Sequence, residues 1–452
     1  MAEAIKLGVI GAGSATFSVG LVKDICLTKS LAGSLVTLMD VDRERVEIMH
    51  RFAERYANEL GADVRFEWTL DRERALKDAD YVINTAQVGG HSQVEKLRAW
   101  QEAQGYYRGM WLHRIIQVRM MVSVARDMER LCPNAWLIQA SNPVFEGCTA
   151  MTRATGIKVC GICHGHYGYR EIAERIGLDP NKVTAQMVGF NHEIWLAHFE
   201  CEGRDAYHLI DEWVEKESEK FYVDYHPSYG ANQISRAALE LYKLTGLFPI
   251  GDTPRRGGWW FHRDLAAKRK WYGEPLGGFD SELGWSIYLE ELEKEVAQIH
   301  SAVADNSAQL TKVFRPRPTG EQHFPLIEAL QGDSRAELQV NIPNRGAITG
   351  IPDDVVVELP AICSRRGIQP LHVGKLPDVL MLAVLYPRML DMERLVAISL
   401  RPDERLLLSF VLDDHRTKSW EQGVRFVREA MALPEFAEVA REAKRAKHSF
   451  WT

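Results

Sequence analysis

The sequence predicts an α/β protein in which a doubly wound parallel sheet comes first and an α+β region follows. Up to about residue 160, short apolar segments alternate with amphipathic helical segments, as in parallel sheets with helices on both faces. Beyond that point, long helical segments surround strand-like segments that are joined by turns. We therefore expect two domains, residues 1–160 and residues 161–452.

The elements of the first domain are predicted from the spacing of their apolar residues. The expected strands cover residues 4–10, 34–42, 65–70, 79–86 and 135–143. The expected helices between them cover residues 22–31, 43–60, 92–104 and 121–133, and the last of these stops at a proline.

The second domain lacks this regular alternation. Residues 158–168 and 182–203 read as strands, and residues 335–367 read as antiparallel strands joined by turns. Helical spacing is expected over residues 207–245, 281–313 and from 375 to the C-terminus.

The composition is that of a globular enzyme. Of the 452 residues 46% are hydrophobic and 26% charged, and the net charge of −7 argues against binding to nucleic acid or to anionic membranes. The N-terminal segment lacks the features of a signal peptide, and no apolar run reaches the ~20 residues that span a bilayer. Seven scattered cysteines do not form a disulfide framework. We expect a cytoplasmic protein.

A glycine motif, GVIGAGS, stands where the first strand turns into the first helix. Gly11 would permit a tight turn and Gly13 the close approach of a pyrophosphate, with Ser14 at the start of the helix. The third position of the fingerprint is Thr16 rather than Gly or Ala, and a tight turn without a ligand is the alternative. The motif predicts a Rossmann-type domain, like that of lactate and malate dehydrogenases, that binds NAD.

Two further segments support this dinucleotide site. Asp40 ends the second strand and could accept hydrogen bonds from ribose hydroxyls, which favours NAD over NADP, although Arg43 and Arg45 leave that choice open. The strand VINTAQVGG ends in Asn84 and small residues, and we expect it, with Val88, to line the nicotinamide side.

A thiol and an imidazole stand at two predicted strand ends, in GICHG and GFNHE. Cys163 and His192 together suit a borderline divalent ion such as Mn²⁺, Fe²⁺, Co²⁺ or Zn²⁺, and two protein ligands leave room for substrate. A packed thiol beside a surface histidine is the alternative. Asn142 precedes a proline at another strand end and could bind a substrate hydroxyl or simply form a turn.

Residues 251–264, GDTPRRGGWWFHRD, are dense in functional groups. Arginines beside an aromatic wall suit a sugar or an anionic substrate, and we single out Arg255, Arg256 and Trp259 for that role. A surface loop with paired arginines is the alternative.

These motifs resemble glycoside hydrolase family 4. GAGS, NTAQVGGH, YYRG, the Asn-Pro strand end, CHG, GFNH, PIGDT, GEQH and DDVVVELP follow one another as in that family, from residue 5 to about residue 440. The combination of CHGHYG and PIGDT is most similar to the members that act on α-glucosides, followed by the α-glucuronidases.

The resemblance implies an unusual glycosidase mechanism that needs both NAD and Mn²⁺, or another divalent ion such as Co²⁺, Ni²⁺ or Fe²⁺. In that mechanism, the sugar C3 hydroxyl is oxidised, a base removes the C2 proton, the C1 leaving group is eliminated, water adds and the hydride returns. It also implies roles for Cys163 and His192 as metal ligands, Asn142 in substrate binding, His164 as proton donor and Asp252 as proton acceptor.

The proton acceptor has alternatives, because other subgroups of the family use a tyrosine. The candidate tyrosines in this chain are Tyr107, Tyr167 and Tyr229.

One departure from the family bears on specificity. The segment that follows YYRG in α-glucosidase-like members is shortened here, and its place is taken by residues that include Trp111, His113, Arg114 and Arg119. With Arg255 and Arg256 as well, the substrate is expected to be a small α-glucoside, or one with an anionic C6 group such as a uronide or a sulfoquinovoside. The resemblance implies a homodimer or a homotetramer. The alternatives are an NAD-dependent sugar or 2-hydroxyacid dehydrogenase that accumulates NADH, and a sensing protein without catalysis.

Overall fold

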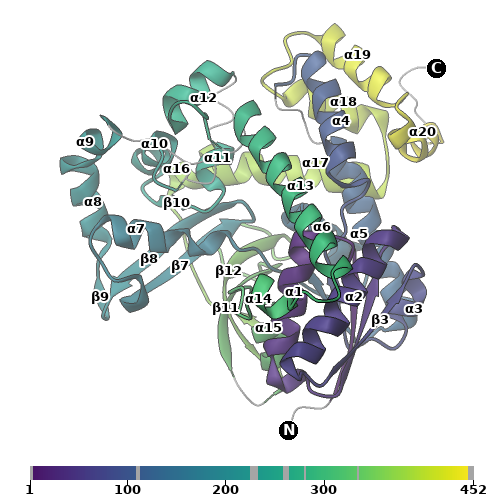
Figure 1. Ribbon diagram of the computed structural model, residues 1–452. Coiled ribbons are helices and arrows are strands. Elements are labelled where there is room, and N and C mark those ends of the chain that lie inside the picture. The colour runs from purple at the N-terminus through teal and green to yellow at the C-terminus, as the bar shows by residue number, and fades with distance from the viewer. Residues whose placement is uncertain are drawn as a thin grey trace.

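One mixed sheet runs through the whole protein (Figure 1). The computed structural model describes residues 4–107, 112–223, 233–257, 264–278, 281–332 and 335–445. In these ranges, the main path of the sheet has the strand order β10-β8-β7-β12-β11-β6-β5-β4-β1-β2-β3, with β9 paired to β8 and β13 to β12.

The N-terminal half of the sheet is parallel, which confirms the predicted Rossmann-type domain. Its strands are β1 (Lys6–Ile10), β2 (Ser34–Met39), β3 (Val64–Thr69), β4 (Tyr81–Asn84), β5 (Trp136–Gln139) and β6 (Lys158–Gly161). The helices of this region are α1 (Ala15–Leu27), α2 (Arg43–Leu60), α3 (Arg72–Leu76), α4 (Gly90–Ala103), α5 (Leu112–Leu131) and α6 (Val144–Ala154). The strand expected over residues 158–168 ends at Gly161, and a 3₁₀ turn follows at Gly165–Gly168.

The other half of the sheet is antiparallel. It consists of β7 (Val183–Phe190), β8 (Glu193–Cys201), β9 (Arg204–Asp205), β10 (Phe248–Ile250), β11 (Ala336–Pro343), β12 (Val356–Ser364) and β13 (Gly367–Pro370). The two halves join where Asn341 of β11 pairs with Gly161 of β6, and β12 joins β7 through the pair Glu358–Gly189. The sheet therefore aligns the ends of β6 and β7 in one row, with β11 and β12 between them.

Helices make up most of the remaining chain. One group, at the left and top of Figure 1, comprises α7 (Tyr169–Arg175), α8 (Tyr207–Lys216), α9 (Ser218–Val223), α10 (Arg236–Thr245), α11 (Thr253–Gly257) and α12 (Leu265–Tyr272). The others are α13 (Glu282–Ala304), α14 (Leu310–Val313), α15 (His323–Gln331), α16 (Asp378–Leu380), α17 (Tyr386–Leu400), α18 (Glu404–Asp413), α19 (Trp420–Ala430) and α20 (Ala437–Ala443).

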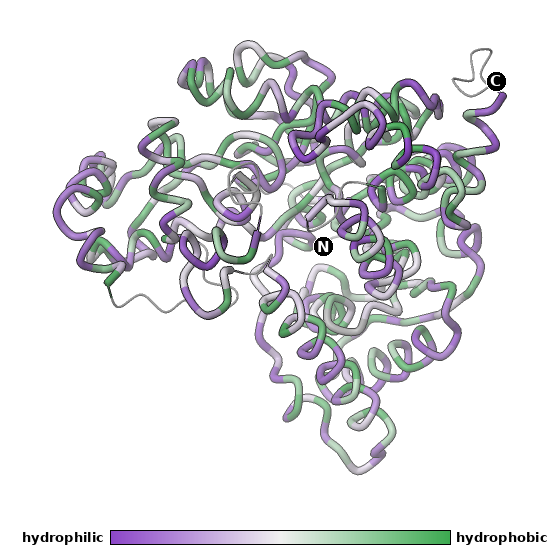
Figure 2. The backbone as a smooth tube through the Cα atoms, turned by 90° about the horizontal axis from the view of Figure 1, so that it is seen from above, coloured by the Kyte–Doolittle hydropathy of each residue, from purple (hydrophilic) through white to green (hydrophobic). Residues whose placement is uncertain are grey.

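Two apolar cores stabilise this arrangement. The larger combines strands of the parallel half with β11, β12 and the C-terminal helices, and the smaller lies among residues 172–250. The division into domains 1–160 and 161–452 stays a prediction. Along the tube of Figure 2, the helices change repeatedly between hydrophilic and hydrophobic residues. Among the described helices, none has the length and apolar character needed to cross a bilayer.

Candidate active site

The turn after β1 is shaped by two glycines. Gly11 has a φ of 88°, and a Cβ there would lie 2.4 Å from backbone atoms of Ala86, so only glycine fits. A Cβ on Gly13 would lie 2.7 Å from Asp40 Oδ2, which accepts a hydrogen bond from the Gly13 amide at 2.8 Å. The turn is thus packed against the strand ends that would border a dinucleotide.

The start of α1 fits the pyrophosphate of such a dinucleotide. Ser14 is the N-cap residue, its side chain makes no capping hydrogen bond, and the first turn of the helix contains no acid. The first amides of a 13-residue helix therefore face an anion with a favourable dipole. Backbone shape and dipole both suit NAD at this edge of the sheet.

Buried side-chain amides hold the loop after β4 in place through hydrogen bonds. Asn84 is fully buried, and its side chain donates to Gln139 Oε1 at 2.9 Å and accepts from the Ala86 amide at 3.2 Å. Gln117 of α5 accepts from the Val88 amide at 2.9 Å and donates to the Ala86 carbonyl at 2.6 Å. Asn84 thus shapes the wall from behind. The sequence predicted neither its partner Gln139 nor Gln117, which holds the backbone of the same loop.

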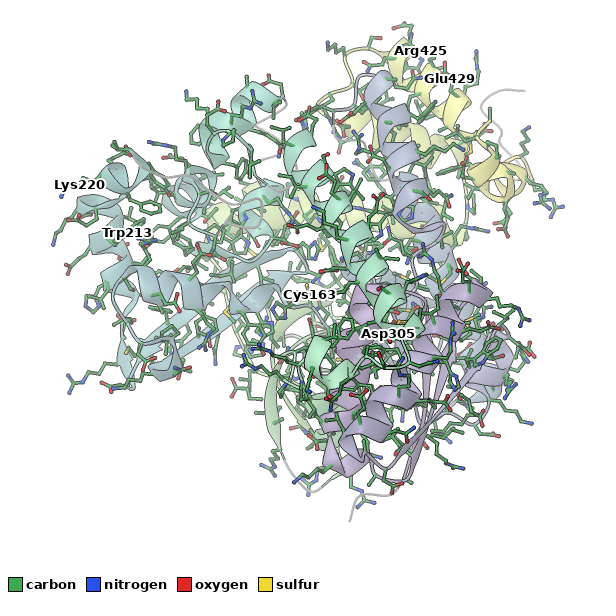
Figure 3. All side chains as sticks on the ribbon, viewed as in Figure 1. Cys163, Trp213, Lys220, Asp305, Arg425 and Glu429 are labelled. Atoms are coloured by element: carbon green, nitrogen blue, oxygen red, sulfur yellow. The ribbon has the colours of Figure 1, made fainter. Side chains whose placement is uncertain are left out.

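Cys163 and His192 lie at the junction of the two halves of the sheet. Cys163 follows β6, and in Figure 3 it appears between the Rossmann part and the lobe of β7 and β8. His192 stands in the turn between β7 and β8 with a φ of 65°, a conformation that non-glycine residues seldom adopt. Its neighbour Asn191 hydrogen-bonds the Cys163 thiol and donates to Glu358 Oε2 at 2.9 Å.

Asp252 is brought to the same place by a close contact between two glycines. Gly251 has a φ of 63°, and a Cβ on it would meet the carbonyl oxygen of Gly165 at 2.6 Å. This contact packs the turn after β10 directly against the turn that follows Cys163. Asp252 Oδ2 then lies 3.3 Å from His192 Nε2 and 2.8 Å from an Arg255 Nη2.

Thr253 fixes the turn from the other side. Its buried hydroxyl donates to the Ile194 carbonyl at 2.9 Å and lies 2.7 Å from the Ile194 amide, which donates to it. Because Ile194 follows His192 by two residues, the strand that carries the imidazole also fixes the carboxylate.

The electrostatics of this cluster suit a bound cation. Burial raises the pKa of the Cys163 thiol to about 12, and the nearby carboxyl groups of Glu358 and Asp252 add to the rise. Burial also raises the pKa of Glu358 to about 7. A divalent ion would favour loss of the thiol proton and stabilise the thiolate, and a thiolate with an imidazole is a fitting donor set.

The protein offers few side chains as ligands for the expected divalent ion. Within the described part of the chain, no three His, Cys, Asp or Glu side chains are grouped as a complete metal site. Cys163 and His192 would be the protein's donors, and the other positions would be open to substrate oxygens and water.

His164 lies on the outer side of the cluster. Its Nδ1 is 3.1 Å from Glu321 Oε1, and this hydrogen bond raises the pKa of His164. Burial would raise the pKa of Glu321, but the bond to His164 lowers it below its usual value. Glu321 lies in the GEQH motif, and only the motif itself could have indicated it.

The other predicted site residues are more scattered. Asn142 is exposed at the end of β5. The Tyr107 hydroxyl donates to Glu282, and the Tyr167 hydroxyl donates to the Gly320 carbonyl. Trp259, Tyr229 and the side chain of Arg256 lie outside the described residues.

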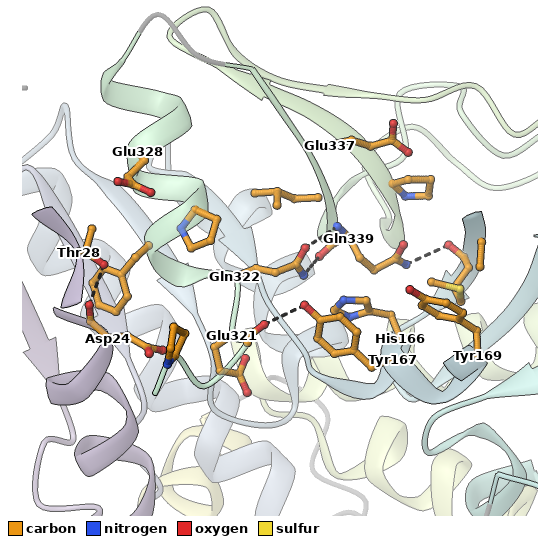
Figure 4. Close-up of a pocket in the computed structure, with 18 of the residues that line it drawn as sticks. Asp24, Thr28, His166, Tyr167, Tyr169, Glu321, Gln322, Glu328, Glu337 and Gln339 are labelled. Atoms are coloured by element: carbon orange, nitrogen blue, oxygen red, sulfur yellow. Dashed lines mark hydrogen bonds between the residues drawn. The ribbon is translucent and has the colours of Figure 1, made fainter. Parts of the chain in front are cut away.

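Figure 4 shows a separate cavity of about 560 Å³ between the end of α1, α15 and β11. Glu321 and Tyr167 line it, whereas Cys163, His192 and Asp252 do not. Gln322 and Gln339 are hydrogen-bonded to each other there. The cavity therefore reaches Glu321 of the His164–Glu321 pair but not the cluster of Cys163, His192 and Asp252.

The comparison with protein families decides the identity of this arrangement. The profile of family 4 glycosyl hydrolases matches residues 6–178, and that of the family's C-terminal domain matches residues 187–417. The chain belongs to family 4 of the glycosyl hydrolases. This confirms the resemblance read from the motifs.

Relatives of this family 4 chain span nearly all of it. An alpha-galactosidase of Bacillus subtilis is 27% identical over 388 residues, 83% of this chain and 85% of that protein. An alpha-galacturonidase of Thermoanaerobacter italicus is 26% identical over 435 residues, 91% of this chain and 92% of that protein.

Solved structures share the fold. The lplD protein of Bacillus subtilis has a TM-score of 0.81 at 21% identity, over 94% of this chain and 99% of that chain. A 6-phospho-alpha-glucosidase from gut microorganisms, solved with NAD and Mn²⁺, has a TM-score of 0.74 at 17% identity, over 95% and 98%. A lactate dehydrogenase of Eimeria maxima has a TM-score of 0.52 at 15% identity, over 87% and 96%, in line with the predicted dehydrogenase-like fold.

Proposed function

We propose that this family 4 enzyme hydrolyses α-glycosides that carry an anionic C6 group, with uronides favoured, by redox-assisted elimination that depends on NAD and Mn²⁺. The observation that carries the proposal is the cluster of Cys163, His192 and Asp252, which follow β6, β7 and β10 of the sheet that also holds the Rossmann-type half. Relatives named alpha-galacturonidase that cover 91% of the chain, and a fold relative solved with NAD and Mn²⁺, support it.

NAD would supply a hydride acceptor for sugar C3, and Mn²⁺ would polarise the C2 and C3 oxygens. The protein's own part is to orient the sugar and to move two protons. Asn142, exposed at the end of β5, would bind a sugar hydroxyl. Asp252, whose Oδ2 lies between His192 and Arg255, would accept the C2 proton.

His164 would act as the proton donor to the leaving group. Its Nδ1 is held by Glu321, which favours the imidazolium and leaves Nε2 as the position from which a proton can be given. Arg255 has an 18% exposed side chain beside Asp252 and would add positive charge for an anionic C6 group.

The test is release of the aglycone from the α-linked galacturonide, glucuronide, sulfoquinovoside, galactoside and glucoside. Each reaction is run complete, without NAD⁺ and without Mn²⁺, while absorbance at the NADH band is followed. The proposal requires release that needs both additions, no build-up of NADH and faster turnover of the anionic sugars. Steady NADH formation without aglycone release would make the protein a sugar dehydrogenase, and preference for the neutral sugars would overturn the anionic specificity.

A further inference from the structure

A buried arginine lies beneath the two turns that carry Asn142 and His192. Arg388, on α17, is only 3% exposed, so its charge must be compensated inside the protein. One guanidinium nitrogen is 2.7 Å from Glu146 Oε1, and Nε is 3.4 Å from Glu193 Oε1. Both carboxylates are themselves almost fully buried.

These two glutamates belong to the functional turns. Glu146 is in the first turn of α6, four residues after Asn142, and Glu193 is the first residue of β8, directly after His192. Arg388 therefore bridges two segments that are almost fifty residues apart in the chain.

A stack of rings connects the same two segments. The Arg388 guanidinium lies over the Phe145 ring at 4.9 Å, and Phe145 stacks on Phe190 with the ring centroids 4.3 Å apart and an angle of 12°. Phe145 precedes Glu146 in α6, and Phe190 ends β7 just before the turn of His192. The ionic bridge and the ring stack thus act in parallel.

Opposite charges surround the buried guanidinium of Arg388. Arg114 of α5 also lies 3.3 Å from Glu146, so two arginines face two carboxylates. A planar guanidinium can face two carboxylates in a geometry that an ammonium group cannot match, and loss of one partner would leave a buried charge uncompensated.

We propose that Arg388 is a positioning residue that fixes the Asn142 turn against the His192 turn, and so sets the affinity for the divalent ion and the placing of the sugar. This inference rests on the proposed function for its reference to substrate. Arg388 itself would touch neither metal nor sugar. It acts through Glu193 on the imidazole and through Glu146 on the asparagine.

The test compares Arg388→Lys with Arg153→Lys. Arg153 also joins α6 to α17, through two 2.7 Å contacts with Glu393, but its partners are not next to Asn142 or His192. Mn²⁺ affinity is measured from the electron paramagnetic resonance signal of the free ion. Loss of support for a metal ligand weakens binding by about 10- to 100-fold, which we expect for Arg388→Lys and not for Arg153→Lys. Equal Mn²⁺ affinity in the two variants would overturn the proposal.

A second variant guards against poor folding of Arg388→Lys. Glu193→Gln keeps the shape of the side chain and removes its charge, and it should weaken Mn²⁺ binding in the same direction. In the double variant, the effects should not add, because both substitutions break one bridge. Full additivity, or unchanged binding in Glu193→Gln, would contradict the bridge.

Catalysis gives a second measurement. With the best sugar of the panel at saturating Mn²⁺, Arg388→Lys should still raise KM, because the Asn142 turn has moved, whereas Arg153→Lys should not. If the wild-type protein binds Mn²⁺ but cleaves no glycoside, the proposed function fails, and the Mn²⁺ comparison still decides the role of Arg388. If the wild-type protein binds no Mn²⁺, both proposals fail.

Discussion

The two edges of the candidate site are built by different means. The dinucleotide edge is shaped by the glycine turn and by neutral amides: Asn84 bonds Gln139, and Gln117 bonds the backbone of the loop after β4. The metal edge is made of ionisable side chains, and burial raises the pKa of two of them, Cys163 and Glu358. The first edge offers backbone shape and the open first amides of α1, whereas the second buries ionisable groups whose charged forms a cation would stabilise.

Removal of the Cys163 thiol should abolish metal binding at the metal edge. We expect Cys163→Ser to lower kcat/KM at least about 1000-fold, because the ion supplies several kcal/mol of charge stabilisation and a hydroxyl is a poor ligand for it. Mn²⁺ binding by calorimetry should be lost together with activity. Cys201→Ser, at a half-buried cysteine of β8, is the matched control and should behave as wild type. Full activity in Cys163→Ser would show that the thiol is not a ligand.

Asp252→Asn should separate acid–base chemistry from metal binding at the same edge. Loss of a general base lowers the rate by about 10²- to 10⁴-fold, and we expect this fall in kcat while Mn²⁺ binding stays within a few-fold of wild type. Single-turnover release of aglycone measures it. The control, Asp205→Asn, also removes a carboxylate near a histidine, 3.7 Å from His208, but at the surface. If kcat hardly changes in Asp252→Asn, Asp252 is not the base, and a tyrosine becomes the candidate.

Much of this site could be predicted from the sequence, because some of its residues stand in short local patterns. Gly11, Asp40 and Cys163 each follow a strand whose apolar run is visible in the chain, and the sheet brings parallel strand ends to one edge. His192 and Asp252 were placed by motif alone, and the structure brings them together through contacts between distant turns.

The residues that could not be predicted act over long separations. Glu146 and Arg388 are 242 residues apart, and each is a charged residue in a helix that a pattern analysis assigns to the surface. Glu358 stands in an apolar strand, and its burial beside Asn191 depends on the pairing of β12 with β7. The continuous sheet was equally hidden, since Asn341 meets Gly161 across about 180 residues.

A substitution that alters the backbone of the glycine turn should weaken the dinucleotide edge without removing a charged group. Gly11→Ala would place a methyl group 2.4 Å from Ala86 backbone atoms, and we expect a loss of about 1–3 kcal/mol in the free energy of unfolding and weaker NAD binding. Urea unfolding and fluorescence titration with NADH measure the two effects. Gly61→Ala is the matched control, because Gly61 also has a positive φ, but a methyl group added there would meet no atom within 4 Å. If both variants lost the same stability, the contact with Ala86 would not matter.

The smallest effect concerns a buried group that packs against α1 of the dinucleotide edge, His323 at the start of α15. Its ring packs edge-on against Phe17 of α1 at 5.6 Å, and burial lowers its pKa to about 4. In the described part of the chain, neither ring nitrogen has a hydrogen-bond partner. The folded protein thus disfavours the imidazolium, whereas the unfolded chain takes up the proton near pH 6.5.

Stability linked to His323 should therefore be present above pH 6.5 and be lost as the pH falls towards 4. His323→Phe keeps a ring of similar size and removes the titration. Between pH 7 and pH 5, its free energy of unfolding should fall by about 1–2 kcal/mol less than that of the wild type, measured with urea. His166, which burial also shifts to a pKa of about 4, is present in both proteins and cancels. The exposed His372, replaced by Gln, should leave the difference unchanged. An identical pH dependence in wild type and His323→Phe would mean that burial of the His323 ring beside α1 does not disfavour the imidazolium in the folded protein.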